Sequence, residues 1–327
     1  MSTPIPSFST LPLRKGDPHY SAWGLYGPDD ERGTLNRLTK DLVLQAKEEI
    51  QTGETISLNL PLDALAKSKV IGRQGFEMKQ YAKHPRVVCD CVWTFNSQGS
   101  TQWDGLRHWA YQETGQFYNG RTLDDFFNED KSIKSTVNGI QNWEKTGIVG
   151  RGILLDFERW RRIKQIDFNP LPLSPHPITL DQLKEVAKLQ GTEIKFGDIL
   201  FIRTGFKPAY EHLSLEDKAK MGTLWQSSGL VQSEETLEWI WNNFSAVAGD
   251  GITFEVWLLT EETASKQDWY MHDILLAGWG MPLGELFDLE RAAEYCEEID
   301  RWSFFVSSEP CNVPGAVASP ANCLAIF

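Results

Sequence analysis

The sequence predicts one α/β domain with mixed sheets. Segments with strand and helix patterns alternate along the 327 residues, but without the regular rhythm of a barrel or a doubly wound sheet. Hydrophobic residues make up 41% of the chain, which is enough for a sizeable core. Neither G-x-G-x-x-G nor G-x-x-x-x-G-K-[ST] follows a predicted strand, so no phosphate-binding loop is indicated. Because no internal repeat occurs, we expect a single domain over residues 1–327.

The N-terminal part of the chain reads as an arm, a loop and a first helix. Residues 1–22 are rich in Pro and Ser and predict an arm that lies on the surface or on a neighbouring subunit. Residues 23–36 mix large aromatic side chains with turn residues, which is typical of an ordered loop. A helix is predicted over 38–51, with Thr39 as its N-cap.

The remaining elements follow from hydrophobic periodicity and from glycine and proline boundaries. The best-marked helix spans 178–191, with Thr179 at its cap and Gly191 as its stop. Residues 61–84 are mostly polar and predict a long excursion, either a lid or an arm. The other predicted helices are 121–145, 235–243, 271–279 and 289–299, and the predicted strands are 55–60, 86–95, 149–156, 197–205, 246–250 and 301–306, before a loop at 312–320.

Composition and charge limit the classes of binding partner and the cellular location that we expect. The net charge of -13 argues against nucleic acid and against anionic membranes, because both attract basic surfaces. No segment approaches the roughly 20 apolar residues of a membrane span, and the N-terminus lacks the pattern of a signal peptide. We therefore expect a cytoplasmic protein whose partner is a small molecule.

The five cysteines do not form a metal-binding pattern. Their number is odd, and the spacing of Cys89 and Cys91 is not that of a zinc site. We expect five reduced thiols that serve mainly in packing.

The segment from Gln98 to His108 is the most unusual stretch. Asp104 and His108 are four residues apart, so a helical turn would place a carboxylate and an imidazole on one face. Such a pair suits general acid/base catalysis, although a structural His paired with an Asp has the same spacing. No Gly-x-Ser-x-Gly elbow occurs, so a serine-hydrolase mechanism has no support.

A second cluster lies downstream. His272 and Glu285 are separated by a predicted helix and turn, and they could converge in space. Together with an Asp they make a ligand set suited to a divalent metal. The alternative is that His272 is a helix-surface or cap residue.

These segments resemble the cyclase family that includes bacterial kynurenine formamidase and isatin hydrolase. The branch that the chain resembles most is the cyclase-like proteins of filamentous fungi, which suggests a role in secondary metabolism. Matching segments occur in the same order over most of the chain, namely residues 23–36, 98–120, 150–156, 197–205, 272–285 and 312–320.

The family signature is His-x-Gly-Thr-His-x-Asp-x-x-x-His. Aligned with it, Asp104 matches a metal-binding Asp and His108 matches the catalytic acid/base His. Gln98 and Gln102 stand where the family has two metal-binding histidines. The resemblance implies that His272 and Glu285 are the downstream metal ligands. Because a Gln carbonyl is a weak ligand, the chain either holds one divalent ion (Zn²⁺, Mn²⁺ or Mg²⁺) on Asp104, His272 and Glu285 or holds none.

The resemblance also implies a swivelling β/β/α fold, assembled as a homodimer or homotetramer with the N-terminal arm crossing to a neighbour. The expected catalytic residues are His108 and Asp104, and the expected substrate-binding residues are Gln98, Gln102, Trp103 and Tyr118. The abundance of Trp fits a closed site for a flat aromatic or polyketide-like substrate.

Two functions follow as hypotheses. The first is a hydrolase or cyclase that acts on a carbonyl of a small cyclic or aromatic metabolite, by amide or lactone hydrolysis or by cyclisation with dehydration. The second is a small-molecule-binding protein that kept the pocket and lost the metal. The two Gln substitutions favour the second hypothesis, and the presence of all four matching Asp, His and Glu residues favours the first.

Overall fold

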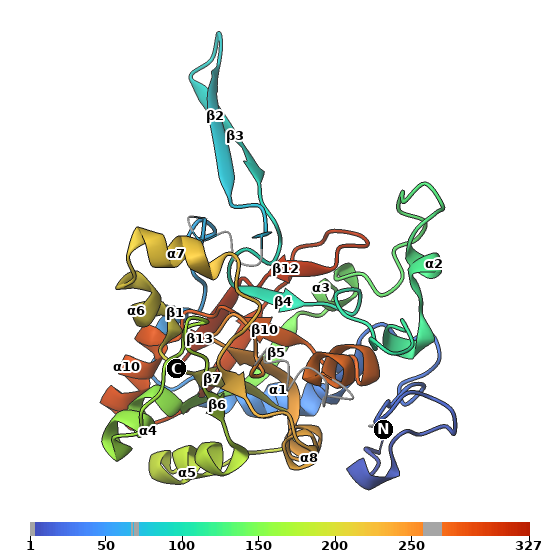
Figure 1. Cartoon of the computed structure of the whole chain (residues 1–327), viewed down its shortest axis with the longest axis vertical. Coiled ribbons are helices and arrows are strands. Elements are labelled where there is room, and N and C mark those ends of the chain that lie inside the picture. The colour runs from blue at the N-terminus through green and yellow to red at the C-terminus, as the bar shows by residue number, and fades with distance from the viewer. Residues whose placement is uncertain (1–3, 67, 69–71, 258–269) are drawn as a thin grey trace.

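The computed structural model describes residues 4–66, 68, 72–257 and 270–327. Its centre is a nine-stranded mixed sheet with the order β1-β13-β11-β5-β7-β9-β10-β4-β12 (Figure 1). The strands are β1 (Thr55–Ser57), β4 (Gln102–Asp104), β5 (Ile148–Asp156), β7 (Asp198–Arg203), β9 (Phe244–Gly249), β10 (Leu283–Glu285), β11 (Ser303–Ser308), β12 (Ala318–Pro320) and β13 (Cys323–Ile326).

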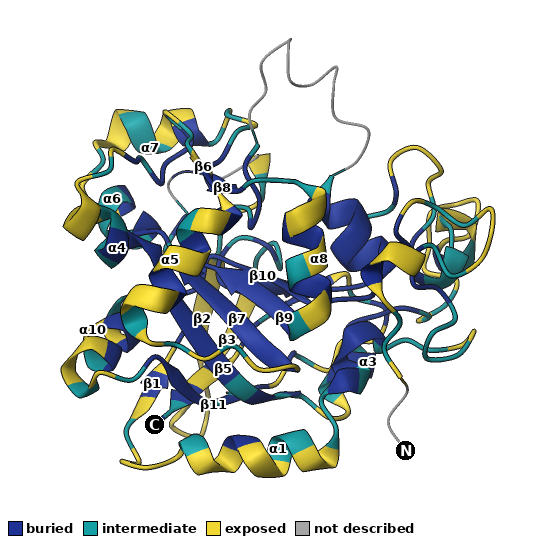
Figure 2. Ribbon diagram, turned by 90° about the horizontal axis from the view of Figure 1, so that it is seen from below, coloured by how far each residue is buried: buried dark blue, intermediate teal, exposed yellow. Residues whose placement is uncertain are grey.

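The middle of the sheet is parallel and its margins are antiparallel. β5, β7, β9 and β10 run parallel to one another, and β4 pairs antiparallel with β10. The parallel strands β5, β7 and β9 are mostly apolar and buried on both faces, as expected where helices cover a sheet (Figure 2). The predicted strands at 149–156, 197–205, 246–250 and 301–306 all lie in this sheet.

Helices surround the sheet, and α1 and α5 begin at the N-cap residues that the sequence predicts. Thr39 accepts a hydrogen bond from the Leu42 amide at the start of α1, and Thr179 forms a capping box with Gln182 at the start of α5. Gly191 ends α5 in the left-handed conformation that glycine tolerates best. The α-helices are α1 (Lys40–Ala46), α2 (Leu123–Phe126), α3 (Gln141–Glu144), α4 (Phe157–Lys164), α5 (Leu180–Gln190), α6 (Phe206–Glu211), α7 (Leu215–Met221), α8 (Glu234–Asn243) and α10 (Glu290–Ile299).

Shorter elements complete the chain. A π-helical segment, η6 (Asp273–Gly278), carries the predicted helix at 271–279. The 3₁₀ turns are η1 (Phe8–Thr10), η2 (Gly33–Arg37), η3 (Lys47–Glu49) and η5 (Tyr118–Gly120), and a small parallel sheet joins β6 (Pro177–Ile178) to β8 (Gly229–Leu230).

The helix predicted over 121–145 is wrong in its extent. Only α2 and α3, of four residues each, are helical in that range. Lys131 and Asn138 adopt positive φ angles of 66° and 57°, which an α-helix cannot accommodate, so the chain turns between the two pieces. The sequence analysis also missed β10, β12 and β13, which have only three or four residues.

A long β-hairpin projects from the body of the molecule (Figure 1). It consists of β2 (Glu77–Lys83) and β3 (Val88–Thr94), paired antiparallel over seven residues. The strand predicted at 86–95 is therefore confirmed, and part of the predicted excursion is its partner strand.

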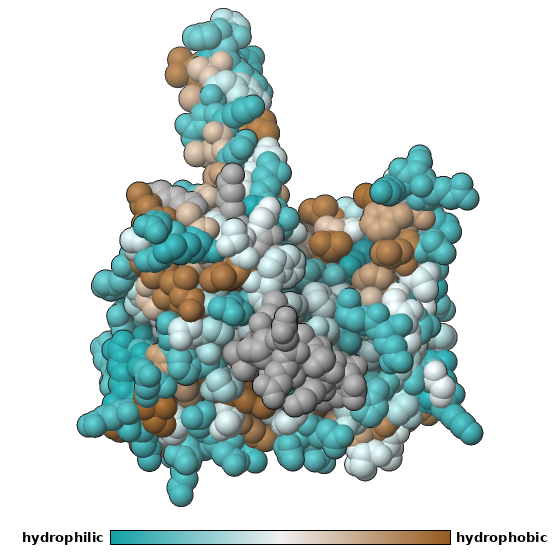
Figure 3. Space-filling view, viewed as in Figure 1, coloured by the Kyte–Doolittle hydropathy of each residue, from teal (hydrophilic) through white to brown (hydrophobic). Residues whose placement is uncertain are grey.

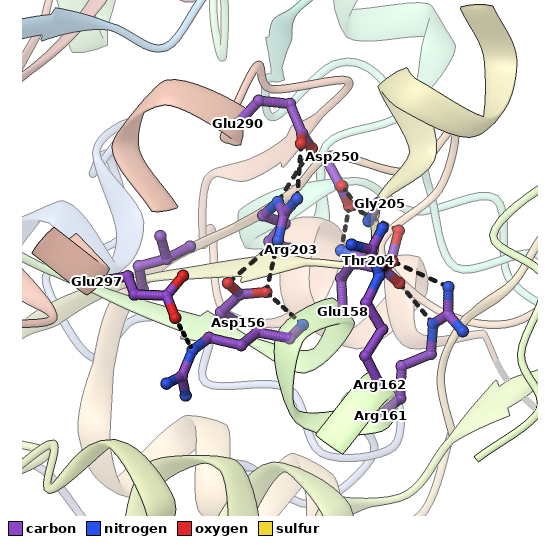
Figure 4. A network of polar contacts seen from close by, with 12 residues as sticks. Asp156, Glu158, Arg161, Arg162, Arg203, Thr204, Gly205, Asp250, Glu290 and Glu297 are labelled. Carbon is purple, nitrogen blue, oxygen red and sulfur yellow. Dashed lines mark hydrogen bonds and ion pairs between the residues drawn. The ribbon is translucent and has the colours of Figure 1, made fainter. Parts of the chain in front are cut away.

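The C-terminal ends of the central strands are tied together by a charged network (Figure 4). Arg203, at the end of β7, donates to Asp156 at the end of β5 and to Glu290 at the start of α10. Asp250, just after β9, accepts hydrogen bonds from the backbone amides of Thr204 and Gly205. These contacts fix the relative positions of three strands and one helix.

The N-terminal segment packs on its own chain. Phe8 and Tyr20 belong to the main hydrophobic core, and the indole of Trp241 donates to the Pro6 carbonyl. All five cysteines are free thiols, as expected, but the expected packing role fits only the buried Cys296 and Cys323, because Cys89 and Cys91 are exposed. Within the described part of the chain, no helix has the length and apolar character needed to cross a membrane.

Candidate functional site

The segment from Gln98 to His108 forms a strand and a turn. Side chains alternate along β4, so Gln102 and Asp104 share one face and Trp103 points to the other. Trp103 is fully buried, donates to the Ser308 hydroxyl over 2.8 Å and packs against Phe287. The structure therefore places Trp103 in the core and not with the other predicted site residues.

Asp104 and His108 lie together, although not through a helix. A turn closed by the His108 amide on the Gly105 carbonyl brings His108 Nε2 to 3.7 Å from Asp104 Oδ2. Gln98 Nε2 donates to Asp104 Oδ1 over 2.8 Å and lies 2.5 Å from His108 Nδ1. Gln98 thus contacts both Asp104 and His108, the acid and base that were paired from their spacing in the sequence.

The downstream residues converge on the same place because β10 pairs with β4. This pairing sets Glu285 opposite Gln102, whose amide donates to Glu285 Oε2 over 2.9 Å. His272 Nε2 lies 3.4 Å from Glu285 Oε1 and 3.9 Å from Asp104 Oδ2. Residues separated by more than 160 positions therefore form one cluster.

Glu255 is a member of the cluster that the sequence analysis missed. This fully buried carboxylate accepts from His272 Nδ1 over 2.6 Å and from the His272 amide over 3.2 Å. A carboxylate on Nδ1 fixes the ring orientation and leaves Nε2 directed at Asp104 and Glu285. No motif surrounds Glu255, so only the folded chain reveals it.

Burial and charge give the titratable groups different protonation behaviour. Burial raises the pKa of Glu285 to about 7, and the neighbouring Asp104 carboxylate adds to that rise. Burial lowers the pKa of His108 more than Asp104 raises it. Burial lowers the pKa of His272, but the Glu255 and Glu285 carboxylates raise it by more. The pKa of His272 therefore lies well above its usual value. His108 is thus the neutral imidazole of the pair.

Four buried oxygens in the cluster have no hydrogen-bond partner among the described residues. They are Gln102 Oε1, Asp104 Oδ2, Glu255 Oε2 and Glu285 Oε1. An unsatisfied buried acceptor costs about 1–3 kcal/mol, so oxygens of this kind are suited to bind a positively charged group. Ligand atoms of Asp104, His108 and His272 also lie within 4.8 Å of one another. This donor set fits a divalent cation.

Aromatic side chains stand beside the two histidines. The rings of Trp109, Trp257 and Tyr270 lie within 5.5–5.8 Å of one another, centre to centre. Trp109 is also 5.2 Å from the His272 ring, and its indole donates to Asp273 over 2.5 Å. We call Trp109, Trp257 and Tyr270 the aromatic wall.

Tyr118 and Arg73 differ in how they relate to the cluster. Tyr118, a predicted substrate-binding residue, is fully buried on η5 and donates to Asp30. The structure does not give it a hydrogen bond to the cluster. Arg73, which the sequence analysis did not single out, donates to the Gln98 carbonyl over 2.9 Å.

Comparisons with known proteins show which family and which fold the chain shares. The model of the Cyclase family, described as "Putative cyclase", matches residues 19–256. The crystal structure of a novel cyclase is 29% identical, with a TM-score of 0.79 over 94% of this chain and 99% of that one. A search of curated proteins gave no match.

Two isatin hydrolases share the fold at lower identity. Isatin hydrolase A from Ralstonia solanacearum is 15% identical, with a TM-score of 0.54 over 88% of this chain and 97% of that one. Isatin hydrolase A from Labrenzia aggregata, bound to benzyl benzoate, is 13% identical, with a TM-score of 0.54 over 89% and 98%. The predicted α/β fold with a mixed sheet of the cyclase type is confirmed. With a family model matching most of its length, the chain belongs to the cyclase family.

Proposed function

We propose that this protein is an enzyme that hydrolyses or cyclises a small cyclic or aromatic metabolite at a carbonyl group. In this proposal His108 transfers the proton, and one divalent cation is held by Asp104, His272 and Glu285. The observation that carries the proposal is the set of four buried, unpartnered oxygens beside a neutral His108.

The donor set defines how a cation would be held. His272 Nε2 lies 3.9 Å from Asp104 Oδ2 and 3.4 Å from Glu285 Oε1, and Gln102 Oε1 offers a weak fourth ligand. Glu255 keeps the Nδ1 proton of His272, so that Nε2 can bind the ion. When bound, the cation would polarise the substrate carbonyl and lower the pKa of water. Zn²⁺, Mn²⁺ and Mg²⁺ are the candidates for this mixture of oxygen and nitrogen ligands.

His108 is suited to moving the proton. Its side chain is 18% exposed whereas that of Asp104 is fully buried, so substrate can reach the imidazole but not the carboxylate. The neutral ring can accept a proton from the attacking group and return it to the leaving group. Asp104, 3.7 Å away, stabilises the imidazolium formed between these two steps.

The substrate class follows from the aromatic wall. Trp109 lies next to His108 and His272, Trp257 lies next to His272, and Tyr270 packs against both indoles. Such ring surfaces bind flat aromatic groups by stacking or edge contacts. The solved proteins of the same fold that are named isatin hydrolases support a carbonyl substrate of this kind.

A substrate screen with a matched pair of variants tests the proposal. Aromatic cyclic amides, lactones and aryl formamides are offered to the wild type, to His108→Ala and to His212→Ala, whose imidazole is exposed just after the C-terminal end of α6. We expect turnover by the wild type and His212→Ala, and a loss of at least about 100-fold in kcat for His108→Ala. Full turnover by His108→Ala would contradict the role of His108. Ligand-dependent stabilisation without turnover and without metal would instead support a non-catalytic binding protein.

A further inference from the structure

Arg73 lies at the foot of the projecting β2–β3 hairpin. The hairpin stands clear of the rest of the molecule, and its two ends join the body at this foot (Figure 1, Figure 3). Arg73 precedes β2 and Gln98 follows β3. Between them, the ring of Phe76 lies 6.2 Å from that of Trp93 and 6.0 Å from that of Phe95, centre to centre. These contacts hold the end that carries Arg73 beside the end that carries Gln98.

Arg73 is joined to the cluster through Gln98. Its Nη1 donates to the Gln98 carbonyl over 2.9 Å, and the side chain of the same glutamine contacts Asp104 and His108. Burial dominates the pKa shifts of His108 and Glu285, and the charge of Arg73 acts on both pKa values in the downward direction that a nearby cation causes. Arg73 therefore stands beside the site, although it is not one of its fully buried residues.

The Arg73 guanidinium has no anionic partner in the part of the chain that the structure describes. Among those residues its side chain forms no ion pair, and the bond to the Gln98 carbonyl is its single hydrogen bond. Asp104 and Glu285 each have a buried oxygen without a hydrogen-bond partner, yet neither pairs with Arg73. Arg73 is thus not the counter-ion of these carboxylates. Its half-buried guanidinium keeps N–H groups free for a ligand.

A free guanidinium at this place is suited to bind a carboxylate. Its planar array of N–H groups can donate to both oxygens of a carboxylate at once. In the proposed function, the reacting carbonyl lies at His108 and at the cation that Asp104 and Glu285 would hold. Because Arg73 pairs with neither of these two ligands, a carboxylate bound to Arg73 is a group separate from the reacting carbonyl.

We propose that Arg73 makes the site selective for substrates that carry a carboxylate in addition to the reacting carbonyl. The proposal rests on the proposed function and narrows its substrate class to aromatic amides, lactones or formamides that bear a carboxylate. The ring system of such a substrate lies along the aromatic wall, its reacting carbonyl lies at His108, and its carboxylate accepts from Arg73. Arg73 is a binding residue in this arrangement and takes no part in proton transfer.

Isothermal titration calorimetry with ligands that differ in one charge tests this proposal. The probes are the ortho, meta and para isomers of carbamoylbenzoate, whose amide represents the reacting carbonyl, and the matching neutral benzenedicarboxamides. The informative variant is Arg73→Gln, and Arg73→Lys keeps the charge without the planar array of donors. The matched control is Arg86→Gln, which removes the same charge from an exposed position between β2 and β3. Thermal unfolding checks that each variant is folded.

We expect the wild type and Arg86→Gln to bind at least one carbamoylbenzoate at least about tenfold more tightly than its diamide. Arg73→Gln should bind the two ligands about equally, and Arg73→Lys should keep a smaller preference for the carboxylate. The proposal is overturned if the wild type prefers no isomer, if Arg73→Gln keeps the wild-type preference, or if Arg86→Gln loses it as fully as Arg73→Gln. No turnover is measured, so a failure here is distinct from a failure of the proposed function, which the screen with His108→Ala would reveal.

Discussion

At the scale of single residues, two histidines in one cluster have different neighbours, and we propose different roles for them. The rings of His108 and His272 are 6.2 Å apart. His272 is fully enclosed by Glu255, Glu285 and Asp104, which suits a ligand, whereas His108 keeps partial exposure, which suits proton transfer. The difference arises from the elements that carry them, a buried π-helical segment and a turn at the end of β4.

Glu255 should act on metal binding through His272. Replacing Glu255 with Gln removes the charge that holds the Nδ1 proton, so we expect divalent-metal affinity to fall about 10–100-fold. Isothermal titration calorimetry with a divalent metal measures the affinity of each variant. Glu238→Gln, an exposed residue on α8, is the matched control. Equal affinities in the two variants would show that Glu255 does not position His272.

Trp109 should contribute mainly to substrate binding. The Trp109→Ala substitution removes the member of the aromatic wall that contacts both histidines, so KM for an aromatic substrate should rise about tenfold while kcat changes less. Steady-state kinetics on a substrate from the screen measures both constants. Trp225→Ala, at an exposed position, should leave them unchanged. A fall in kcat alone would argue against a binding role.

At the scale of elements, charged contacts fasten η3 to the sheet. Glu49 accepts from Arg151 on β5 over 2.7 Å and from Ser303 on β11 over 2.8 Å, and Arg301 lies 3.3 Å from the same carboxylate. Burial alone would raise the pKa of Glu49, but these three partners together lower it below its usual value.

The Glu49→Gln substitution should therefore destabilise the fold in a pH-dependent way. A carboxylate with a lowered pKa in the folded state stabilises the protein above its unfolded pKa, and that stabilisation is lost as the pH falls through the folded pKa. We expect a loss of about 2 kcal/mol in unfolding free energy at pH 7 and a smaller loss below pH 4. Urea unfolding at both pH values measures it. A difference that grew toward low pH would contradict the assignment.

Elements with strong local signals could be predicted from the sequence, and short strands could not. Thr179 and Gly191 mark α5 because a capping box and a left-handed glycine act locally. β10 and β12 have three residues each and are defined by pairing with distant strands, β10 with β9 and β4 and β12 with β4. The failed prediction of one helix over 121–145 has the same cause, because its apolar residues serve separate packing contacts on either side of two turns.

In the site, too, local features could be predicted from the sequence and contacts between distant segments could not. The pairing of Asp104 with His108 could be predicted from their spacing. The contact forms through a strand and a turn, however, and not through the predicted helical turn. Trp103 lies beside them in sequence but points into the core, because strand residues alternate. Glu255 could not be found, because nothing near it in sequence indicates that it meets His272.

At the scale of the whole molecule, the sheet assembles one site from distant segments. β4 brings Asp104, β10 brings Glu285, and the chain after β9 brings Glu255 and His272. The network around Arg203 holds the ends of β5 and β7 in register with the chain after β9. The result is three buried carboxylates around one imidazole, a concentration of negative charge that favours a bound cation.

Metal content tests the central claim most directly. The purified full-length protein, the Glu285→Gln variant and the Glu294→Gln variant are analysed for divalent metals by mass spectrometry after extensive dialysis. Glu294 is an exposed residue on α10 and serves as the control. The cluster predicts about one equivalent of a divalent metal in the wild type and in Glu294→Gln, and little or none in Glu285→Gln. A wild type without metal even after reconstitution with Zn²⁺, Mn²⁺ or Mg²⁺, or equal metal in all three proteins, would contradict it.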